Sequence, residues 1–212
     1  MDFMTTKGNI LRGFFLTFVI LSLIFVLGWA DSWEVVQKES SKIKSISAHF
    51  SQKKHMRILT KPLVSKGHFY FQAPDSVRWE YTSPIKSVLL MTKRDIKRYT
   101  QSNRGVVEDS GGSLESMRIV LQEISQWSRG RFNENEHFTA VLKGGKDPRI
   151  ILTPKEKGFS AMISRIVINL SPDRPGVIRS IKIDENKGNY TLFEFTDVQI
   201  NGKISETLFR EV

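Results

Sequence analysis

Residues 69–84 read FYFQAPDSVRWEYTSP, and this aromatic-rich stretch decides the fold. Large side chains alternate with polar ones on both sides of Ala73-Pro74-Asp75. A period of two is typical of a β-strand with one buried face, and proline followed by aspartate is typical of a turn. The stretch therefore predicts two strands, each with its large side chains on one face: Phe69 and Phe71 on the first strand, and Val77, Trp79 and Tyr81 on the second.

Strand patterns occupy most of the remaining chain. Gly, Pro, Asn and Asp separate them at intervals of roughly 8–12 residues, as in a curved antiparallel sheet. The run KSVLLMT at 86–92 is apolar on both faces at its centre, so we expect it to be covered on both. The other expected strands are 95–100, 137–142, 149–154, 163–170, 177–184, 190–200 and 206–212.

Two segments show a helical period instead. Residues 32–45 place Trp33, Val36, Ile43 and Ile46 on one face of a helix. A second stripe consists of Leu114, Met117, Leu121 and Ile124 and ends near Trp127.

The order of these elements is a helix, three or four strands, a helical insertion, and five or six further strands. Residues 105–115 have the least regular pattern, and Gly111-Gly112 within them predicts a hinge before the second helix. This order predicts an α+β fold with one large, strongly curved antiparallel sheet. Because two helices are too few to cover both faces of so many strands, we expect them to pack against the concave apolar face.

The N-terminus has the features of a secretory signal peptide. Lys7 and Arg12 precede an apolar run at 13–28, and Gly28-Trp29-Ala30 supplies small residues at a cleavage site. The apolar run is slightly short for a membrane-spanning helix, which needs about 20 residues. We therefore expect residues 1–30 to be removed after Ala30, leaving 31–212 as a single exported domain. A retained membrane anchor is the alternative.

Composition and motifs give little support for catalysis. The 212-residue chain has no cysteine, and no histidine pair, nucleophile motif or phosphate-binding loop has the required spacing. We therefore expect no enzyme activity, metal or cofactor. The net charge of +10 favours anionic surfaces, and for an exported protein these are lipid headgroups or an acidic partner rather than nucleic acid.

Five short elements, taken in order, are similar to one known family. They are AHFSQ at 48–52, Gly67 before HFYF, APDSVRWEYTSP at 73–84, LTP at 152–154 and FTDVQINGKISETLF at 195–209. In these the chain resembles the periplasmic carriers of outer-membrane lipoproteins, the LolA-like family. The family commonly has an arginine immediately before the first proline, tied to holding the helical lid closed, and here that position is Ala73.

The resemblance implies an incomplete, half-open antiparallel β-barrel with helices across its mouth. It also implies a monomeric periplasmic carrier whose apolar cavity takes lipoprotein acyl chains from an inner-membrane exporter to an outer-membrane acceptor. The strand aromatics would form the cavity wall, and the second helix would form its lid. The expected lipid-binding residues are Phe50, Phe69, Phe71, Val77, Trp79, Tyr81, Leu90, Leu114, Met117, Leu121 and Ile124.

Other interpretations stay open at this point. The same side chains could fill an ordinary sandwich core. The cavity could hold another amphiphile, such as a glycolipid or phospholipid. The protein could be a signal-anchored domain beside the inner membrane, or an exported hydrolase whose site has no recognisable motif.

Overall fold

The computed structural model describes residues 32–93, 95–103, 105–109, 113–132, 136–185 and 188–210. The expected signal peptide and the expected Gly111-Gly112 hinge lie outside these residues. None of the described helices has the length and apolar character needed to cross a membrane.

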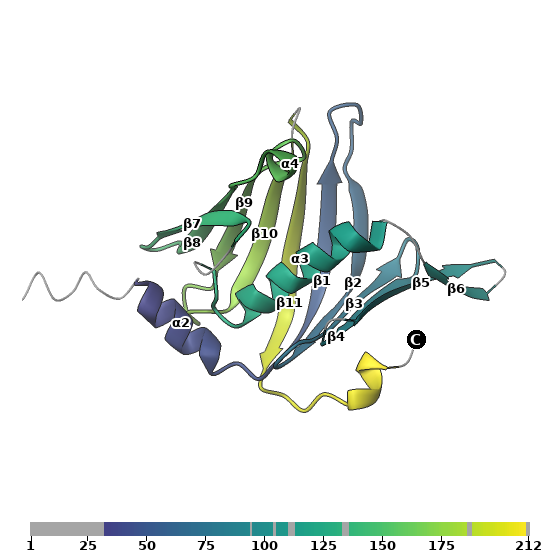
Figure 1. Cartoon of the computed structure of the whole chain (residues 1–212), viewed down its shortest axis with the longest axis horizontal. Helices are drawn as coiled ribbons and strands as arrows, with labels where there is room; N and C mark the ends of the chain where they lie inside the picture. Colours follow the sequence, from purple (N-terminus) through teal and green to yellow (C-terminus); the bar gives the residue numbers. More distant parts are fainter. Residues whose placement is uncertain are drawn as a thin grey trace, which may run out of the picture.

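Eleven strands form one antiparallel sheet in the order β6-β5-β4-β3-β2-β1-β11-β10-β9-β8-β7 (Figure 1). Strands adjacent in the sheet are adjacent in sequence, except that β1 pairs with β11 and so joins the two halves. β6 and β7 are the two edges, so the sheet does not close. The strands are β1 (Ser45–His55), β2 (Leu63–Gln72), β3 (Ser76–Ser83), β4 (Ser87–Thr92), β5 (Asp95–Ser102), β6 (Gly105–Asp109), β7 (Phe138–Lys143), β8 (Arg149–Pro154), β9 (Ile163–Leu170), β10 (Ile178–Glu185) and β11 (Tyr190–Ile200).

Helices flank the sheet at three places. α2 (Trp33–Ser41) precedes β1, α3 (Ser113–Ser128) separates the two halves of the sheet, and the short α4 (Lys157–Ser160) precedes β9. A 3-10 helix, η2 (Glu206–Phe209), lies near the C-terminus. The α+β organisation and the single antiparallel sheet expected from sequence are therefore correct.

Several expected boundaries were wrong. Six strands precede α3 rather than three or four, because β1 and β6 carry too many polar residues to show a clear period of two. The first helix ends at Ser41, and Ser45 already belongs to β1. Residues 206–209 form η2 instead of a strand, since Ser205 caps that turn by accepting a hydrogen bond from the Thr207 amide at 3.4 Å.

The strand register brings the large side chains of the first half to one face. Phe69 lies opposite Trp79, and Phe71 lies opposite Val77. Trp79 in turn lies opposite Leu89 of β4. We call this the inner face, and its buried residues on the strands are Phe50, Phe69, Phe71, Val77, Trp79, Leu89, Met91, Phe138, Ile150, Leu152, Ile166, Ile168, Leu170 and Ile181.

α3 lies across the inner face (Figure 1), and its side chains belong to the same buried cluster. Leu121, Ile124 and Trp127 are 1%, 8% and 3% exposed. Contacts join α3 to β3 and β5 in the first half of the sheet.

α2 packs at one end of the sheet, where Val36 is buried in the same cluster. The Ser40 hydroxyl donates a hydrogen bond to the Gly176 carbonyl at 3.3 Å. Gly176 has φ +88°, and a Cβ there would lie 2.5 Å from Ser40 Oγ, so glycine is needed for this approach.

The opposite, outer face is covered at β3 and β4 by the C-terminal segment. Arg78 Nη1 donates to the Leu208 carbonyl at 3.0 Å, and Thr92 Oγ1 donates to the Phe209 carbonyl at 3.3 Å. Val88 and Leu90 are buried on this face, while Leu89 and Met91 are buried on the inner face. The expectation that residues 86–92 are covered on both sides is confirmed.

Candidate functional site

An aromatic cluster lies at the centre of the inner face, around Trp79. The Trp79 ring lies 4.8 Å from Phe50, 5.3 Å from Phe69 and 5.3 Å from Phe193, measured between ring centroids. Phe195 is 6.1 Å away. Most of these pairs meet edge to face, which is the favoured arrangement for aromatic rings. The cluster draws on β1, β2, β3 and β11, so it spans the junction between the two halves of the sheet.

Gly67 makes room for this cluster. A Cβ at that position would lie 2.7 Å from Phe50 Cζ and 1.8 Å from the Glu80 carbonyl oxygen. No side chain fits there without movement of the β2–β3 backbone. The glycine that carries part of the family resemblance therefore allows the Phe50 ring to approach the β2 backbone closely.

An apolar cavity of about 30 Å³, enough for one or two water-sized groups, lies between the second half of α3 and the sheet. Its walls include Ile124 and Ser128 from α3 and Ala48, Phe69 and Phe195 from the sheet. A cavity of this size is too small for an acyl chain.

α3 and the turn directly after it carry polar atoms that are buried without a hydrogen-bond partner. They are the Ser125 hydroxyl, the Trp127 indole nitrogen and Arg129 Nε. Each such atom costs about 1–3 kcal/mol relative to a hydrated one. The buried position of α3 is therefore less favourable than its apolar contacts alone suggest.

At the edge of the aromatic cluster, Tyr81 contributes a hydroxyl. It donates a 2.7 Å hydrogen bond to Gln52 Oε1, and burial raises the pKa of the tyrosine. Tyr81 thus stays neutral at physiological pH. Among the described residues, those that line the apolar cavity include no carboxylate.

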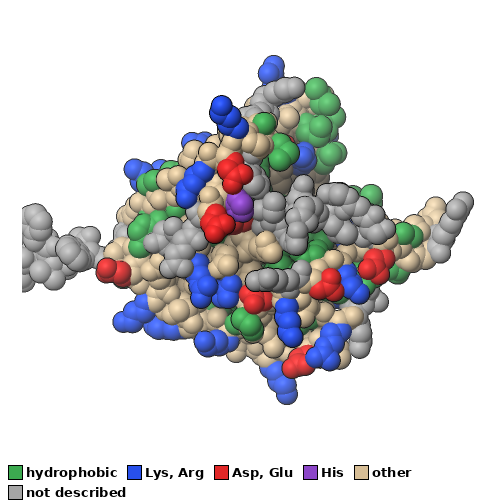
Figure 2. Space-filling view, viewed as in Figure 1, with side chains coloured by type: hydrophobic (Ala, Val, Ile, Leu, Met, Phe, Trp, Pro, Cys, Tyr) green, Lys and Arg blue, Asp and Glu red, His purple; other side chains and the backbone are tan. Residues whose placement is uncertain are grey.

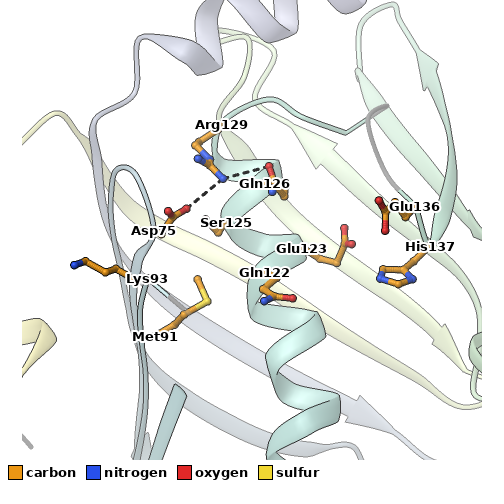
Figure 3. A pocket seen from close by; sticks show the side chains of 10 residues that line it. All are labelled: Asp75, Met91, Lys93, Gln122, Glu123, Ser125, Gln126, Arg129, Glu136 and His137. Atoms are coloured by element: carbon orange, nitrogen blue, oxygen red, sulfur yellow. Dashed lines mark hydrogen bonds and ion pairs between the residues drawn. The ribbon is translucent and has the colours of Figure 1, made fainter. Parts of the chain in front are cut away.

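A polar groove of about 360 Å³ runs beside α3 (Figure 3). Asp75, Met91 and Lys93 lie on one side of the helix in this view, and Glu136 and His137 lie on the other. α3 contributes Gln122, Glu123, Ser125 and Gln126, and Arg129 follows directly after its last residue. The groove therefore offers both hydrogen-bond donors and acceptors next to the apolar face.

An ion pair connects α3 to the β2–β3 turn across this groove. Arg129 Nη2 lies 3.3 Å from Asp75 Oδ1 and also donates to Gln126 Oε1 at 3.2 Å (Figure 3). Asp75 is two residues from Ala73, the position at which the resembling family has its arginine. Here the arginine directly follows the last residue of α3, and the carboxylate is on the β2–β3 turn.

Most of the predicted site residues come together in the structure. Seven of them belong to one buried cluster: Phe50, Phe69, Phe71, Val77, Trp79, Leu121 and Ile124. Tyr81 is half-buried and packs against that cluster. Leu90 lies on the outer face, because it is opposite Arg78 rather than Trp79, and Leu89 and Met91 occupy the inner positions instead. The side chains of Leu114 and Met117 lie outside the described ones.

Sequence reasoning missed the contribution of the second half of the sheet. Ile181, Phe193 and Phe195 pack with the Trp79 cluster. Residues 190–200 were expected to form a strand, and Phe193 and Phe195 alternate within it, so the signal was present. No local pattern in the sequence indicates that β1 pairs with β11, and this pairing places Phe195 opposite Phe50.

Metal-binding geometry is absent from the described part of the chain, where no three His, Asp or Glu side chains gather closely enough to hold an ion.

Comparison with known proteins gives consistent matches. The family described as outer membrane lipoprotein carrier protein LolA matches residues 41–211. An outer-membrane lipoprotein carrier protein from Pseudoalteromonas translucida is 23% identical over 199 residues, covering 92% of this chain and 89% of that protein. One from Erwinia tasmaniensis is 25% identical over 189 residues, covering 86% and 84%. The crystal structure of a LolA superfamily protein from Nitrosomonas europaea has a TM-score of 0.45 and 9% identity, covering 84% and 97%.

Proposed function

The chain belongs to the outer membrane lipoprotein carrier protein LolA family, and from that premise we propose that it is a periplasmic carrier of lipoproteins. It binds the acyl chains of its cargo on the inner face of a half-open barrel and escorts them from the inner to the outer membrane. α3 and α2 cover that face when no cargo is bound. No catalytic step is part of this function.

The physical need for such a carrier is large. Moving an acyl chain of ~15 methylenes from a bilayer into water costs about 12 kcal/mol, at about 0.8 kcal/mol per CH₂. A carrier must offset most of this cost with apolar contacts. It must not offset all of it, since the cargo has to leave again.

The proposal rests on two features seen together: the sheet has a continuous apolar face, and the helix that covers it has buried polar atoms without hydrogen-bond partners. The inner face runs from Leu89 on β4 through Trp79 to Ile150 on β8. α3 covers it with Leu121 and Ile124 but brings buried, unpartnered polar atoms with it. Displacing α3 rehydrates those atoms and frees the apolar face, so cargo can replace the helix at a modest net cost.

The present conformation corresponds to a closed carrier. A cavity of about 30 Å³ cannot hold an acyl chain, and in this proposal α3 moves away from the sheet so that the cargo reaches the inner face. The ion pair between Arg129 and Asp75 holds the helix in the closed position. The ion pair thereby takes the role of the arginine that the family commonly has before the first proline, where this chain has Ala73.

The polar groove beside α3 suits the peptide part of the cargo. A lipoprotein has a hydrophilic chain directly after its acylated residue, and this chain must leave the apolar face at an edge. Gln122, Gln126 and Glu136 there can bind backbone amides and carbonyls.

Purification from the periplasm followed by lipid extraction and mass spectrometry tests the proposal. We expect a triacylated lipoprotein or its acylated fragment to copurify, and Trp79→Glu to remove it while the circular dichroism spectrum is retained. Copurification of a glycolipid or phospholipid alone would favour the alternative, a carrier of another amphiphile. An intact residue 1 on N-terminal sequencing would contradict a freely diffusing shuttle.

A further inference from the structure

The β1–β2 hairpin exposes large apolar side chains at its tip. Ile58 is 82% exposed, Leu63 is 55% exposed, and Val64 and Leu59 are 44% and 41% exposed. Single exposed apolar residues are common on soluble proteins, but four within seven positions form a patch that needs a partner. Figure 2 shows hydrophobic side chains gathered at the end of the molecule where Figure 1 places this hairpin.

The hairpin projects beyond the sheet that supports it. Pairing between β1 and β11 ends at His55 and Tyr190, and β2 begins at Leu63, so residues 56–62 have no neighbouring strand. The base is held firmly. The His55 ring stacks on Tyr190 at 4.2 Å, and the Arg57 amide donates to Asn189 Oδ1 at 3.0 Å. The apolar tip is thus presented to solvent on a fixed support.

Cations surround the apolar tip. Lys53 and Lys54 on β1 are paired with Glu194 and Glu185. Within the described part of the chain, Arg57, Lys61 and Lys66 form no ion pair, and no acidic residue occurs between positions 51 and 74. The positive charge of Arg57 and Lys61 is therefore uncompensated beside the exposed Ile58 and Leu63, and Lys66 adds a further cation on β2, opposite Ser51.

We propose that this hairpin tip docks the protein on an anionic lipid bilayer. Apolar side chains at the end of the hairpin enter the boundary between headgroups and acyl chains, and the flanking cations bind lipid phosphates. The charge pattern favours an anionic membrane over an apolar protein groove, which would leave three cations without partners. This inference goes beyond carrying lipoproteins, because it concerns where the protein meets a membrane and holds for any cargo.

The absence of cysteine allows a direct test. Thr60 is exposed at the tip, so Thr60→Cys can be labelled with an environment-sensitive fluorophore such as NBD. Val107, 53% exposed on the β5–β6 hairpin and followed by Glu108 and Asp109, supplies the control Val107→Cys. We expect a blue shift and an intensity rise at position 60 with phosphatidylglycerol-containing vesicles, little change with phosphatidylcholine vesicles, and none at position 107.

Two further variants separate the apolar and ionic contributions. Ile58→Asp should reduce vesicle binding at least tenfold, and Lys61→Gln should weaken it about fivefold, which is the loss expected for one cation near a charged surface. Lipoprotein copurification should be unaffected by either change, so failure here and failure of the carrier function are distinguishable. No spectral change at position 60 with anionic vesicles would overturn the proposal. An equal spectral change at position 107 would also overturn it. So would crosslinking of position 60 to another protein, if the fluorophore at position 60 showed no spectral change.

Discussion

Shortening Leu121 should make cargo binding tighter although it makes the protein less stable. Leu121 is 1% exposed, on the side of α3 that contacts the inner face. Replacing a buried leucine by alanine costs about 3 kcal/mol, within the usual 2–5 kcal/mol. If α3 is a movable cover, Leu121→Ala destabilises the closed form by this amount and leaves the open sheet unchanged.

The expected gain follows from the closed–open equilibrium. A destabilisation of about 3 kcal/mol raises the opening constant by about 150-fold, and the apparent affinity for an acyl chain rises by up to that factor. The gain is smaller once the open form becomes the majority. Titration with a fluorescent fatty acid measures the affinity, and urea denaturation measures the free energy of unfolding.

Leu152→Ala is the matched control. Leu152 is 0% exposed and belongs to the same buried cluster, but it lies on β8, which stays in the sheet when α3 moves. We expect Leu152→Ala to lower the free energy of unfolding by about as much as Leu121→Ala does. We also expect it to bind the fatty acid no more tightly than the unmodified protein. If both variants lose affinity to the same extent, α3 is a permanent part of the core and the reasoning is wrong.

Three other predictions follow from particular contacts. Asp75→Asn should raise the apparent affinity for an acyl chain about two- to threefold, because a partly exposed ion pair is worth about 0.5 kcal/mol. The control Glu206→Gln breaks the exposed ion pair with Arg210 at 3.1 Å and should leave the affinity measured by fatty-acid titration unchanged. Equal effects of the two substitutions would contradict a role of the Arg129–Asp75 ion pair in holding α3 closed. Gly67→Ala should lower the free energy of unfolding in urea by at least about 2 kcal/mol, whereas Gly158→Ala, with open space around its Cβ position, should change it by less than about 0.5 kcal/mol. Burial raises the pKa of Asp184, but hydrogen bonds and charges from Lys182 and Arg165 outweigh it and hold the pKa below its ordinary value. The ionised Asp184 therefore stabilises the folded protein fully above the unfolded-state pKa of about 3.9, and this stabilisation is lost as the pH falls below that value. The difference in free energy of unfolding between the unmodified protein and Asp184→Asn should shrink from pH 6 to pH 3. A constant difference would refute this.

Local patterns were sufficient to predict the strands of the first half of the sheet and the inner position of their aromatic side chains. Phe69, Phe71, Val77 and Trp79 alternate with polar residues, and a period of two leaves only one face for them. β4 was harder, because Val88, Leu89, Leu90 and Met91 are all apolar. Only the register with β3 shows that Leu90 faces outward.

Tertiary relations explain the remaining differences. The cover over the outer face at Leu90 comes from η2, more than 110 residues later, and no local pattern indicates it. The pairing of Phe50 with Phe195 and the ion pair of Asp75 with Arg129 are likewise long-range. The fit of the second half of α3 against the sheet, which leaves a cavity of about 30 Å³ beside Ile124 and Ser128, depends on side-chain shapes from several strands.

Displacement of α3 by cargo is the central claim, and a distance measurement tests it most directly. Gln122 on α3 and Thr196 on β11 are both exposed, so Gln122→Cys and Thr196→Cys can be introduced together into the cysteine-free chain and spin-labelled. Double electron–electron resonance then reports the distance between the labels with and without a triacylated lipopeptide. We expect a single narrow distance distribution without ligand and a longer, broader distribution with it. Saturating binding of the lipopeptide with an unchanged distance would contradict it.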